Sequence, residues 1–271
     1  MAAGVPTVWQ GLLAHVESQG LRFHTLKRTV IGGSAAPRAM VEKFEAGFDV
    51  RVIHAWGMTE LSPVGTVCAF KGKHAGAGEE QRFAVQAKQG RAVYGVDMKI
   101  VDEKGDEIPF GSEKSGDLFV RGPWVIESYF ALENHSPLVN GWFPTGDVAK
   151  IDADGFMQIT DRSKDVIKSG GEWIGSIDLE NIAMGHPAVA MAACIAAHHP
   201  KWDERPLLVV VKKPGVDVSR DELIAYYEGK IAKWWTPDDV VFVDAIPLGA
   251  TGKMQKNLLR ERFKDHKLPG A

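Results

Sequence analysis

The spacing of apolar side chains predicts a helix at the start of the chain. The apolar residues Val5, Trp9, Leu12, Leu13 and Val16 recur at intervals that place them on one helical face. This helix is expected to begin almost at the first residue, with no strand before it.

A strand–helix–strand unit is predicted next. The short run of residues 29–31 is typical of a strand, which two glycines end. Pro37 suits the first turn of a helix, and residues 51–54 begin a second strand after it. Strands joined in this way are parallel, so their carboxyl ends meet at one edge of the sheet, where ligands bind. The loops at residues 32–34 and 55–60 are therefore expected at one crevice.

Residues 90–160 predict antiparallel β structure. Short apolar runs alternate with tight turns there, and Lys104-Gly105 and Asp154-Gly155 are turn pairs typical of β-hairpins. We expect these strands to form a small antiparallel barrel or sandwich.

After Trp173 the pattern predicts a compact α+β unit. A short helix begins near Ser176, and the continuous apolar run at residues 207–211 is typical of a buried strand. Ser219 and Glu222 have the spacing of a capping box, which predicts the start of a second helix. Another strand and a basic helix complete this unit.

Composition and charge exclude several classes of function. The 271 residues are 45% hydrophobic and 25% charged, as is usual for a soluble globular protein. The net charge of -3 gives no reason to expect a nucleic-acid partner, and we expect no signal peptide or transmembrane segment. The distant Cys68 and Cys194 fit a reducing cytoplasm. The adjacent His198 and His199 are interpreted as loop residues rather than metal ligands.

Two loops and the start of a charged segment carry side chains that suit nucleotide chemistry. The Thr59 hydroxyl can donate to a phosphate oxygen, the Glu60 carboxylate can hold Mg²⁺, and Trp56 offers a face to a purine. The Asp147 carboxylate could accept hydrogen bonds from a ribose diol, and Arg162 could reach the same sugar or a phosphate. The structural alternatives are a turn with a buried tryptophan, an aspartate in a hairpin connection and a solvated charged linker.

A lysine near the C-terminus is a further candidate. Lys253 follows a glycine-containing loop, from which a point charge can reach phosphates. The segment is not a P-loop, because Met254 follows the lysine where Ser or Thr is required. An ordinary surface lysine is the alternative interpretation.

Five segments, taken together and in this order, resemble the acyl-CoA synthetase branch of the adenylate-forming (AMP-binding) superfamily. They are GGSAAPRAM, HAWGMTELSPVGT, GDLFVRGPWV, GWFPTGDVAKIDADGFMQITDRSKDVIKSGGEWI and ATGKMQK. The segments SKDVIKSGGEWIGSIDLEN and HPKWDERPLLVVV look most like fatty-acid–CoA ligases and relatives acting on short or medium acids, methylthio acids included.

The resemblance implies a two-step ligase of α/β and α+β fold. ATP and a small carboxylic acid, with Mg²⁺, give an acyl-adenylate and pyrophosphate, and coenzyme A then takes the acyl group and releases AMP. Residues 1–161 would be the C-terminal portion of the adenylation domain, β-rich from about residue 90. Residues 162–168 would be a hinge, and residues 169–271 a small mobile C-terminal domain.

The resemblance also implies roles for residues of the larger part. Trp56 would cover the adenine, Thr59 would contact the α-phosphate, Glu60 would hold Mg²⁺, and Asp147 with Arg162 would bind the ribose. The full set that would line the nucleotide and acyl site is Gly33, Ser34, Ala35, Trp56, Gly57, Thr59, Glu60, Asp147 and Arg162. Trp9 is a further candidate near the acyl pocket.

In the smaller part, Lys253 would bridge the acyl carboxylate and the phosphate during adenylation. Lys164 would be the pivot about which this part rotates. The residues that would then face the CoA channel are Ser169, Gly170, Gly171, Glu172 and Trp173.

One expected feature of the family is missing from the chain. Family members carry upstream a Ser/Thr/Gly-rich phosphate loop that ends in Pro-Lys, and this sequence has no such loop. We therefore expect the C-terminal portion of a ligase, completed by a missing N-terminal polypeptide or working as part of a split enzyme; a homodimer is another expected arrangement. The alternative hypothesis is a non-catalytic nucleotide- or CoA-binding remnant.

Overall fold

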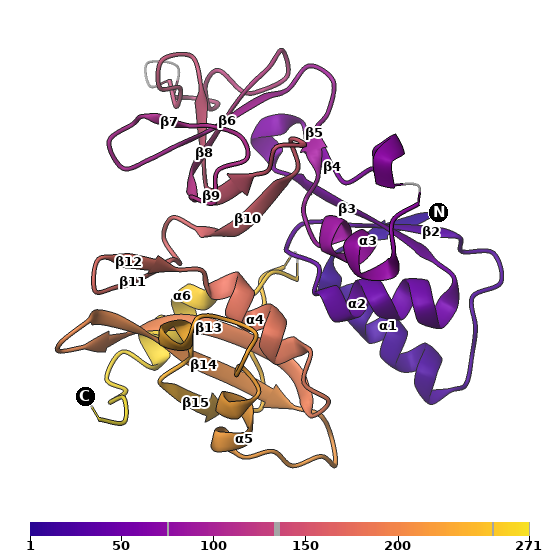
Figure 1. The fold of residues 1–271 in the computed structure, drawn as a ribbon, viewed down its shortest axis with the longest axis vertical. Helices are drawn as coiled ribbons and strands as arrows, with labels where there is room; N and C mark the ends of the chain where they lie inside the picture. Colours follow the sequence, from indigo (N-terminus) through magenta and orange to yellow (C-terminus); the bar gives the residue numbers. More distant parts are fainter. Residues whose placement is uncertain (75, 133–135, 251, 271) are drawn as a thin grey trace. The chain divides into compact units, whose positions relative to one another are not determined.

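The chain folds into two compact units, Met1–Ser163 and Lys164–Ala271, whose strands and helices are shown in Figure 1. The computed structural model describes residues 1–74, 76–132, 136–250 and 252–270. The mixed α/β and α+β fold class predicted from the sequence is confirmed. The rotation expected about the connecting segment stays a prediction.

The first unit begins with a five-stranded sheet in the order β1-β2-β3-β4-β5. Its strands are β1 (Ala2–Gly4), β2 (Arg28–Ile31), β3 (Arg51–Gly57), β4 (Val64–Val67) and β5 (Arg91–Ala92). The first three strands are parallel, and β4 and β5 are antiparallel to their neighbours. The expectation of no strand before the first helix is wrong, because the short β1 has no apolar pattern of its own and is defined by pairing with β2.

Helices cover this sheet and bury its core. They are α1 (Pro6–Ser18), α2 (Arg38–Glu42), the π-helix η1 (Lys43–Gly47) and α3 (Glu79–Gln86). Two short 3₁₀-helices, η2 (Thr59–Leu61) and η3 (Gly72–His74), follow β3 and β4. Leu13 of α1 and Val41 of α2 are buried together with Ile31 of β2. The helix predicted to begin at Pro37 is thus α2 continued by one π-helical turn.

The second sheet of this unit is antiparallel and has the order β10-β9-β8-β6-β7. Its strands are β6 (Asp97–Val101), β7 (Glu107–Ile108), β8 (Gly116–Arg121), β9 (Phe143–Ile151) and β10 (Met157–Arg162). Both predicted hairpins are confirmed, since β6 pairs with β7 and β9 with β10. The predicted barrel is wrong. In the described residues, β7 and β10 are the two edges of an open sheet, and the two-residue β7 is too short to close it.

The second unit is built on one sheet, β12-β11-β14-β13, with β15 added parallel to β14. Its elements are β11 (Ile167–Ser169), β12 (Glu172–Ile174), α4 (Ser176–Met184), β13 (Val189–His199), β14 (Asp203–Lys212), α5 (Arg220–Ala225), the 3₁₀-helix η4 (Lys233–Trp235), β15 (Asp239–Phe242) and α6 (Lys256–Arg262). The predicted capping box is confirmed: the Ser219 hydroxyl accepts from the Glu222 amide, and the Glu222 carboxylate accepts from the Ser219 amide at 2.8 Å. Within the described ranges, helices long and apolar enough to cross a membrane are absent.

The longest strand, β13, was not predicted. Its sequence is rich in alanine, which has little preference for strands. It forms because it pairs along its length with the apolar β14. His198 and His199 belong to this strand, opposite Glu204 and Asp203, so their interpretation as loop residues is wrong.

Candidate functional site

The Asp147 carboxylate is the centre of the candidate site in the first unit. Its side chain, in β9, is 5% exposed. Trp56 Nε1, from β3, donates to Oδ2 at 2.9 Å, and Arg162 Nε, from β10, donates to Oδ1 at 3.0 Å. The strand register sets Arg162 directly opposite Asp147. Three strands therefore bring together three residues that the sequence analysis placed at the nucleotide site.

The backbone around this carboxylate is also held. The Asp147 amide donates to Thr145 Oγ1 at 3.1 Å, and that hydroxyl donates to the Leu118 carbonyl at 2.9 Å. The Ser163 amide donates to the Gly146 carbonyl at 3.0 Å, across the end of the β9–β10 pair. The carboxylate is thus presented from a fixed strand, not from a free loop.

Trp56 has a role that sequence reasoning missed. The side chain is 8% exposed and lies in the core beside Leu61. Most of the ring is therefore covered, and only a small part could meet an adenine. Its indole N–H fixes Asp147 across 91 positions of sequence, a distance at which local patterns give no signal.

Two glycines allow close backbone packing next to this tryptophan. A Cβ at Gly65 would lie 2.4 Å from the Trp56 ring, and a Cβ at Gly57 would lie 1.9 Å from the Pro63 carbonyl oxygen. Gly57 is thus required where β3 passes the start of β4. Its place beside the nucleotide stays a prediction.

The Thr59-Glu60 pair forms the 3₁₀ turn η2 directly after β3. Thr59 is exposed and Glu60 is half-buried. The Tyr129 hydroxyl donates to Glu60 Oε1 at 3.0 Å. Burial, and then this contact with the carboxylate, raises the pKa of Tyr129, so the phenol stays protonated and can donate. Tyr129 is a second residue that sequence reasoning missed.

The chemistry of Glu60 fits a magnesium ion held mainly by substrate. Within the described residues, groups of three or more His, Cys, Asp or Glu side chains able to hold a metal are absent. Magnesium commonly binds through one or two carboxylates, with phosphate oxygens and waters completing its shell. A single oriented carboxylate beside an exposed threonine suits that mode.

The loop after β2 is anchored by a histidine. Gly33 has a φ of +85°, which favours glycine, and the neighbouring Ser34 is exposed and Ala35 half-buried. The Ala36 amide donates to His54 Nε2 at 3.3 Å. Burial lowers the pKa of His54 to about 4, so the ring is neutral near pH 7 and can accept this bond. His54 is a third residue that sequence reasoning missed.

Trp9 has a packing role. It is 4% exposed and meets the Phe44 ring edge-on, at 5.5 Å between centroids. These contacts place it inside the core formed by α1 and the sheet. Its expected place near an acyl pocket stays a prediction.

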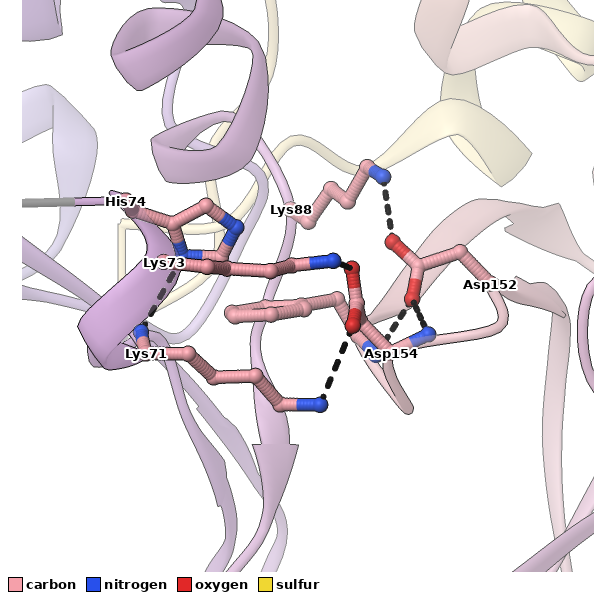
Figure 2. A network of polar contacts seen from close by, with 7 residues as sticks. Lys71, Lys73, His74, Lys88, Asp152 and Asp154 are labelled. Atoms are coloured by element: carbon pink, nitrogen blue, oxygen red, sulfur yellow. Dashed lines mark hydrogen bonds and ion pairs between the residues drawn. The ribbon is translucent and has the colours of Figure 1, made fainter. Parts of the chain in front are cut away.

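Ion pairs join the β9–β10 hairpin to the segment between β4 and β5, as Figure 2 shows. Lys88 Nζ contacts Asp152 at 2.7 Å, and both Lys71, at 3.2 Å, and Lys73 contact Asp154. Hydrogen bonds from Lys73 and then Lys71 lower the pKa of Asp154. Burial opposes the same shift at Asp152, but the Lys88 contact and backbone donors outweigh it and lower that pKa too. The network links the two sheets that supply the site.

In the second unit, Gly170 and Gly171 form the turn between β11 and β12. Their φ values of +60° and +86° suit a two-residue hairpin turn with positive φ at both positions. The Gly170 amide donates to the Trp202 carbonyl at 2.9 Å, and a Cβ at Gly170 would lie 2.9 Å from the Trp202 ring. A Cβ at Gly171 would meet no atom within 4 Å. Glu172 is exposed and Trp173 half-buried on the strand that follows.

The remaining predicted residues of this unit lie at its start and near its end. Lys164 opens the unit and is exposed, while Ser169 is buried and accepts from Arg205 Nη1 at 3.2 Å. Lys253 is exposed in a small hairpin whose feet are bridged between Leu248 and Met254. Lys253 is thus exposed beside this backbone bridge, and its role at the phosphate stays a prediction.

Two families match this chain. Residues 1–130 match the family described as AMP-binding enzyme, and residues 178–253 match the AMP-binding enzyme C-terminal domain. Together the two matches reach into both units.

Curated relatives align with nearly the whole chain. The 3-methylmercaptopropionyl-CoA ligase of Ruegeria lacuscaerulensis is 54% identical over 265 residues, which cover 98% of this chain and 49% of that protein. The medium-chain-fatty-acid–CoA ligase of Ectopseudomonas oleovorans is 49% identical over 265 residues, with 98% and 48% covered. The chain spans about half the length of the curated relatives it matches.

Solved structures also match nearly the whole chain and about half of their own length. ATP-bound MatB from Rhodopseudomonas palustris superposes with a TM-score of 0.82 at 28% identity, covering 98% of this chain and 51% of that one. The anthranilate CoA ligase AuaEII in complex with anthranoyl-AMP gives 0.84 at 26% identity, with 97% and 49% covered. With its two family matches and these likenesses, the chain belongs to the AMP-binding, adenylate-forming enzyme family.

Proposed function

We propose that this chain carries the ribose-binding and C-terminal parts of an acid–CoA ligase. The substrate would be a short- or medium-chain carboxylic acid, methylthio acids included. One observation carries the proposal: a buried Asp147 held by Trp56 and Arg162 in a chain whose relatives over 98% of its length are CoA ligases.

The first unit would bind the nucleotide. A carboxylate oxygen can accept more than one hydrogen bond, so Asp147 can accept both ribose hydroxyls while its donors hold it in place. The Arg162 side chain is 46% exposed, and its guanidinium has further N–H groups for the sugar or a phosphate. The loop at residues 33–35 would border the adenine and the acyl group, and Thr59 would donate to the α-phosphate.

Magnesium belongs to the same proposal. Glu60, oriented by Tyr129, would provide a carboxylate oxygen to the ion. A bound Mg²⁺ supplies charge neutralisation on the polyphosphate, which lets a negatively charged acid approach it.

Adenylation would join a carboxylate oxygen of the acid to the α-phosphorus as the bond to pyrophosphate breaks. Lys253 would lie between the two anions and stabilise the charge that develops there. In the second step the coenzyme A sulfur would bond to the acyl carbonyl carbon, AMP would leave and the thiol proton would pass to solvent. Lys164 would be the pivot between the steps, and the hairpin with Gly170 and Gly171 would border the CoA channel.

The complete ligase is proposed to work in the cytoplasm. The phosphate loop that this sequence lacks would come from another stretch of polypeptide, and a second copy of the chain is the other partner considered. The structure of the first unit supports nucleotide binding by Asp147 whichever arrangement holds.

Acid-dependent exchange of radiolabelled pyrophosphate into ATP tests the proposal. Octanoate and 3-(methylthio)propionate are the first acids to compare, because the relatives' names point to this range. Exchange that depends on the acid, followed by thioester formation with CoA, is the expected result. Binding of AMP without exchange would instead favour a non-catalytic nucleotide-binding protein.

A further inference from the structure

A buried cation lies three positions after Lys253. Lys256, the first residue of α6, is 9% exposed. Its Nζ donates to Ser176 Oγ at 2.6 Å and lies 2.6 Å from Glu180 Oε1. Both partners belong to α4, so one lysine joins the start of α6 to the helix that follows β12.

The partner carboxylate is itself held inside the unit. The Glu180 side chain is 9% exposed, and its Oε1 also accepts from the Cys194 amide of β13 at 2.8 Å. Charged groups are rarely buried to this extent unless they are paired and hydrogen-bonded. A buried ion pair seldom adds stability over a well-packed apolar pair; what it can add is one defined docking geometry.

The Lys253 segment is a hairpin that ends at this ion pair. The Gly249 amide donates to the Lys253 carbonyl at 2.8 Å, and the Gln255 amide donates to the Pro247 carbonyl at 2.9 Å. These two bonds, with the bridge between Leu248 and Met254, hold residues 247–249 against residues 253–255. On the unit itself, Met254 packs against the core beside β13 and β14, and Lys256 follows at the end of the segment and contacts α4.

The contact between Lys256 and Ser176 also lies close to the Gly170-Gly171 hairpin along the chain. Ser176 is the first residue of α4, two positions after β12 ends at Ile174. The Lys253 hairpin and the Gly170-Gly171 hairpin are therefore both attached to the N-terminal end of α4, one through the side chain of Lys256 and the other through the backbone.

We propose that Lys256 is a positioning residue, whose buried contact with Ser176 and Glu180 holds the Lys253 hairpin in one orientation on α4. The inference rests on the proposed function, in which Lys253 acts in adenylation. Without the ion pair the hairpin loses its polar anchor on α4, so its internal bonds open more often and its direction is less well fixed. Adenylation should then suffer more than thioester formation.

The test compares Lys256→Met with a matched control, Lys264→Met. Lys264 lies just after α6 and pairs with Glu261 at 2.7 Å on the surface, with side chains 60% and 73% exposed. The first readout is the hydrogen-exchange rate of the Gly249, Gly252 and Gln255 amides in this chain. The second is the rate of adenylation and of thioester formation, measured in the complete ligase.

In Lys256→Met we expect these amides to exchange about tenfold faster, while the amides of β13 and β14 keep their rates. Adenylation should fall at least about tenfold, and thioester formation from supplied acyl-adenylate should stay within about twofold. The control should match the wild type, and Lys256→Arg should recover part of the loss. If Lys256→Met showed the hydrogen-exchange rates and the adenylation rate of the wild type, the inference would be overturned. An equal loss of both half-reactions in a folded variant would overturn it too.

Glu180→Gln keeps the proposal testable if the methionine variant does not fold. The amide oxygen can still accept from Cys194, while the charge opposite Lys256 is gone. The same split between half-reactions is expected, and its absence would overturn the inference. If the wild type never adenylates, the proposed function is refuted but this inference is not. The hydrogen-exchange rates in Lys256→Met would still decide whether Lys256 anchors the hairpin.

Discussion

The two groups of candidate residues are built in opposite ways. In the first unit, Asp147 is buried in a strand and held by side chains from two others. In the second unit, Lys253 and Gly171 lie exposed at the turns of small hairpins. The first arrangement suits a group that must keep one geometry for a bound ribose. The second would suit groups that, in the proposed function, meet different partners in the two steps.

The largest effect should come from Lys253→Ala. Adenylation should fall about 10²–10³-fold, the loss typical when one preorganised charge donor at a reacting centre is removed. Because the side chain is exposed, the melting temperature should not change. Thioester formation from supplied acyl-adenylate should continue. Equal loss in both half-reactions would contradict the role given to Lys253.

Asp147→Ala should reduce both activity and stability, unlike Lys253→Ala. The change leaves the buried Trp56 indole N–H without its acceptor, which should cost about 1–3 kcal/mol in the free energy of unfolding. Denaturant unfolding and AMP binding are the measurements. The control is Asp97→Ala, which removes an exposed cross-strand pair with Arg121 in the same sheet. If both variants lose the same free energy of unfolding, the buried contact of Asp147 with Trp56 stabilises the fold no more than an exposed ion pair does.

Gly171→Val should affect mainly the CoA step. The position has a φ of +86° and no atom within 4 Å of an added Cβ, so the side chain would project into open space. We expect about 1–2 kcal/mol of strain and a clear rise in KM for CoA. Pyrophosphate exchange should stay near the wild-type rate. Unchanged CoA kinetics would contradict the assignment of this hairpin to the CoA channel.

The smallest effect should come from Asp152→Asn in the network that joins the two sheets. At pH 7 the loss of the partly exposed pair with Lys88 should cost about 0.5–1 kcal/mol. The pKa of Asp152 is lowered in the fold, so its charged form stabilises the protein above the ordinary aspartate value. This contribution is lost as pH falls through the lowered pKa. The difference between wild type and variant should therefore shrink below about pH 4, and a constant difference would contradict the pairing.

Local patterns in the sequence predicted much of the fold. Turn pairs such as Asp154-Gly155 and the capping box at Ser219 carry their own signal, and both are confirmed. The strands β1 and β13 were missed because their alanine-rich sequences gain strand structure from neighbours. The barrel was wrong because closure depends on pairing between distant strands, which local patterns do not encode.

For the candidate site, motif resemblance identified the residues and not their contacts. Trp56 was expected to meet a nucleotide with its ring, yet its N–H holds Asp147. Tyr129, His54 and Lys256 were missed because their partners lie 69, 18 and 80 positions away. Pairing at such separations is set by tertiary packing, which sequence periodicity does not report.

Calorimetric titration with AMP asks whether Asp147 holds the ribose independently of the second unit. We expect the wild type to bind AMP and Lys253→Ala to bind it as the wild type does. Asp147→Asn should bind AMP at least about tenfold more weakly, a difference of about 1.4 kcal/mol. AMP affinity unchanged in Asp147→Asn would contradict the ribose-binding role proposed for Asp147.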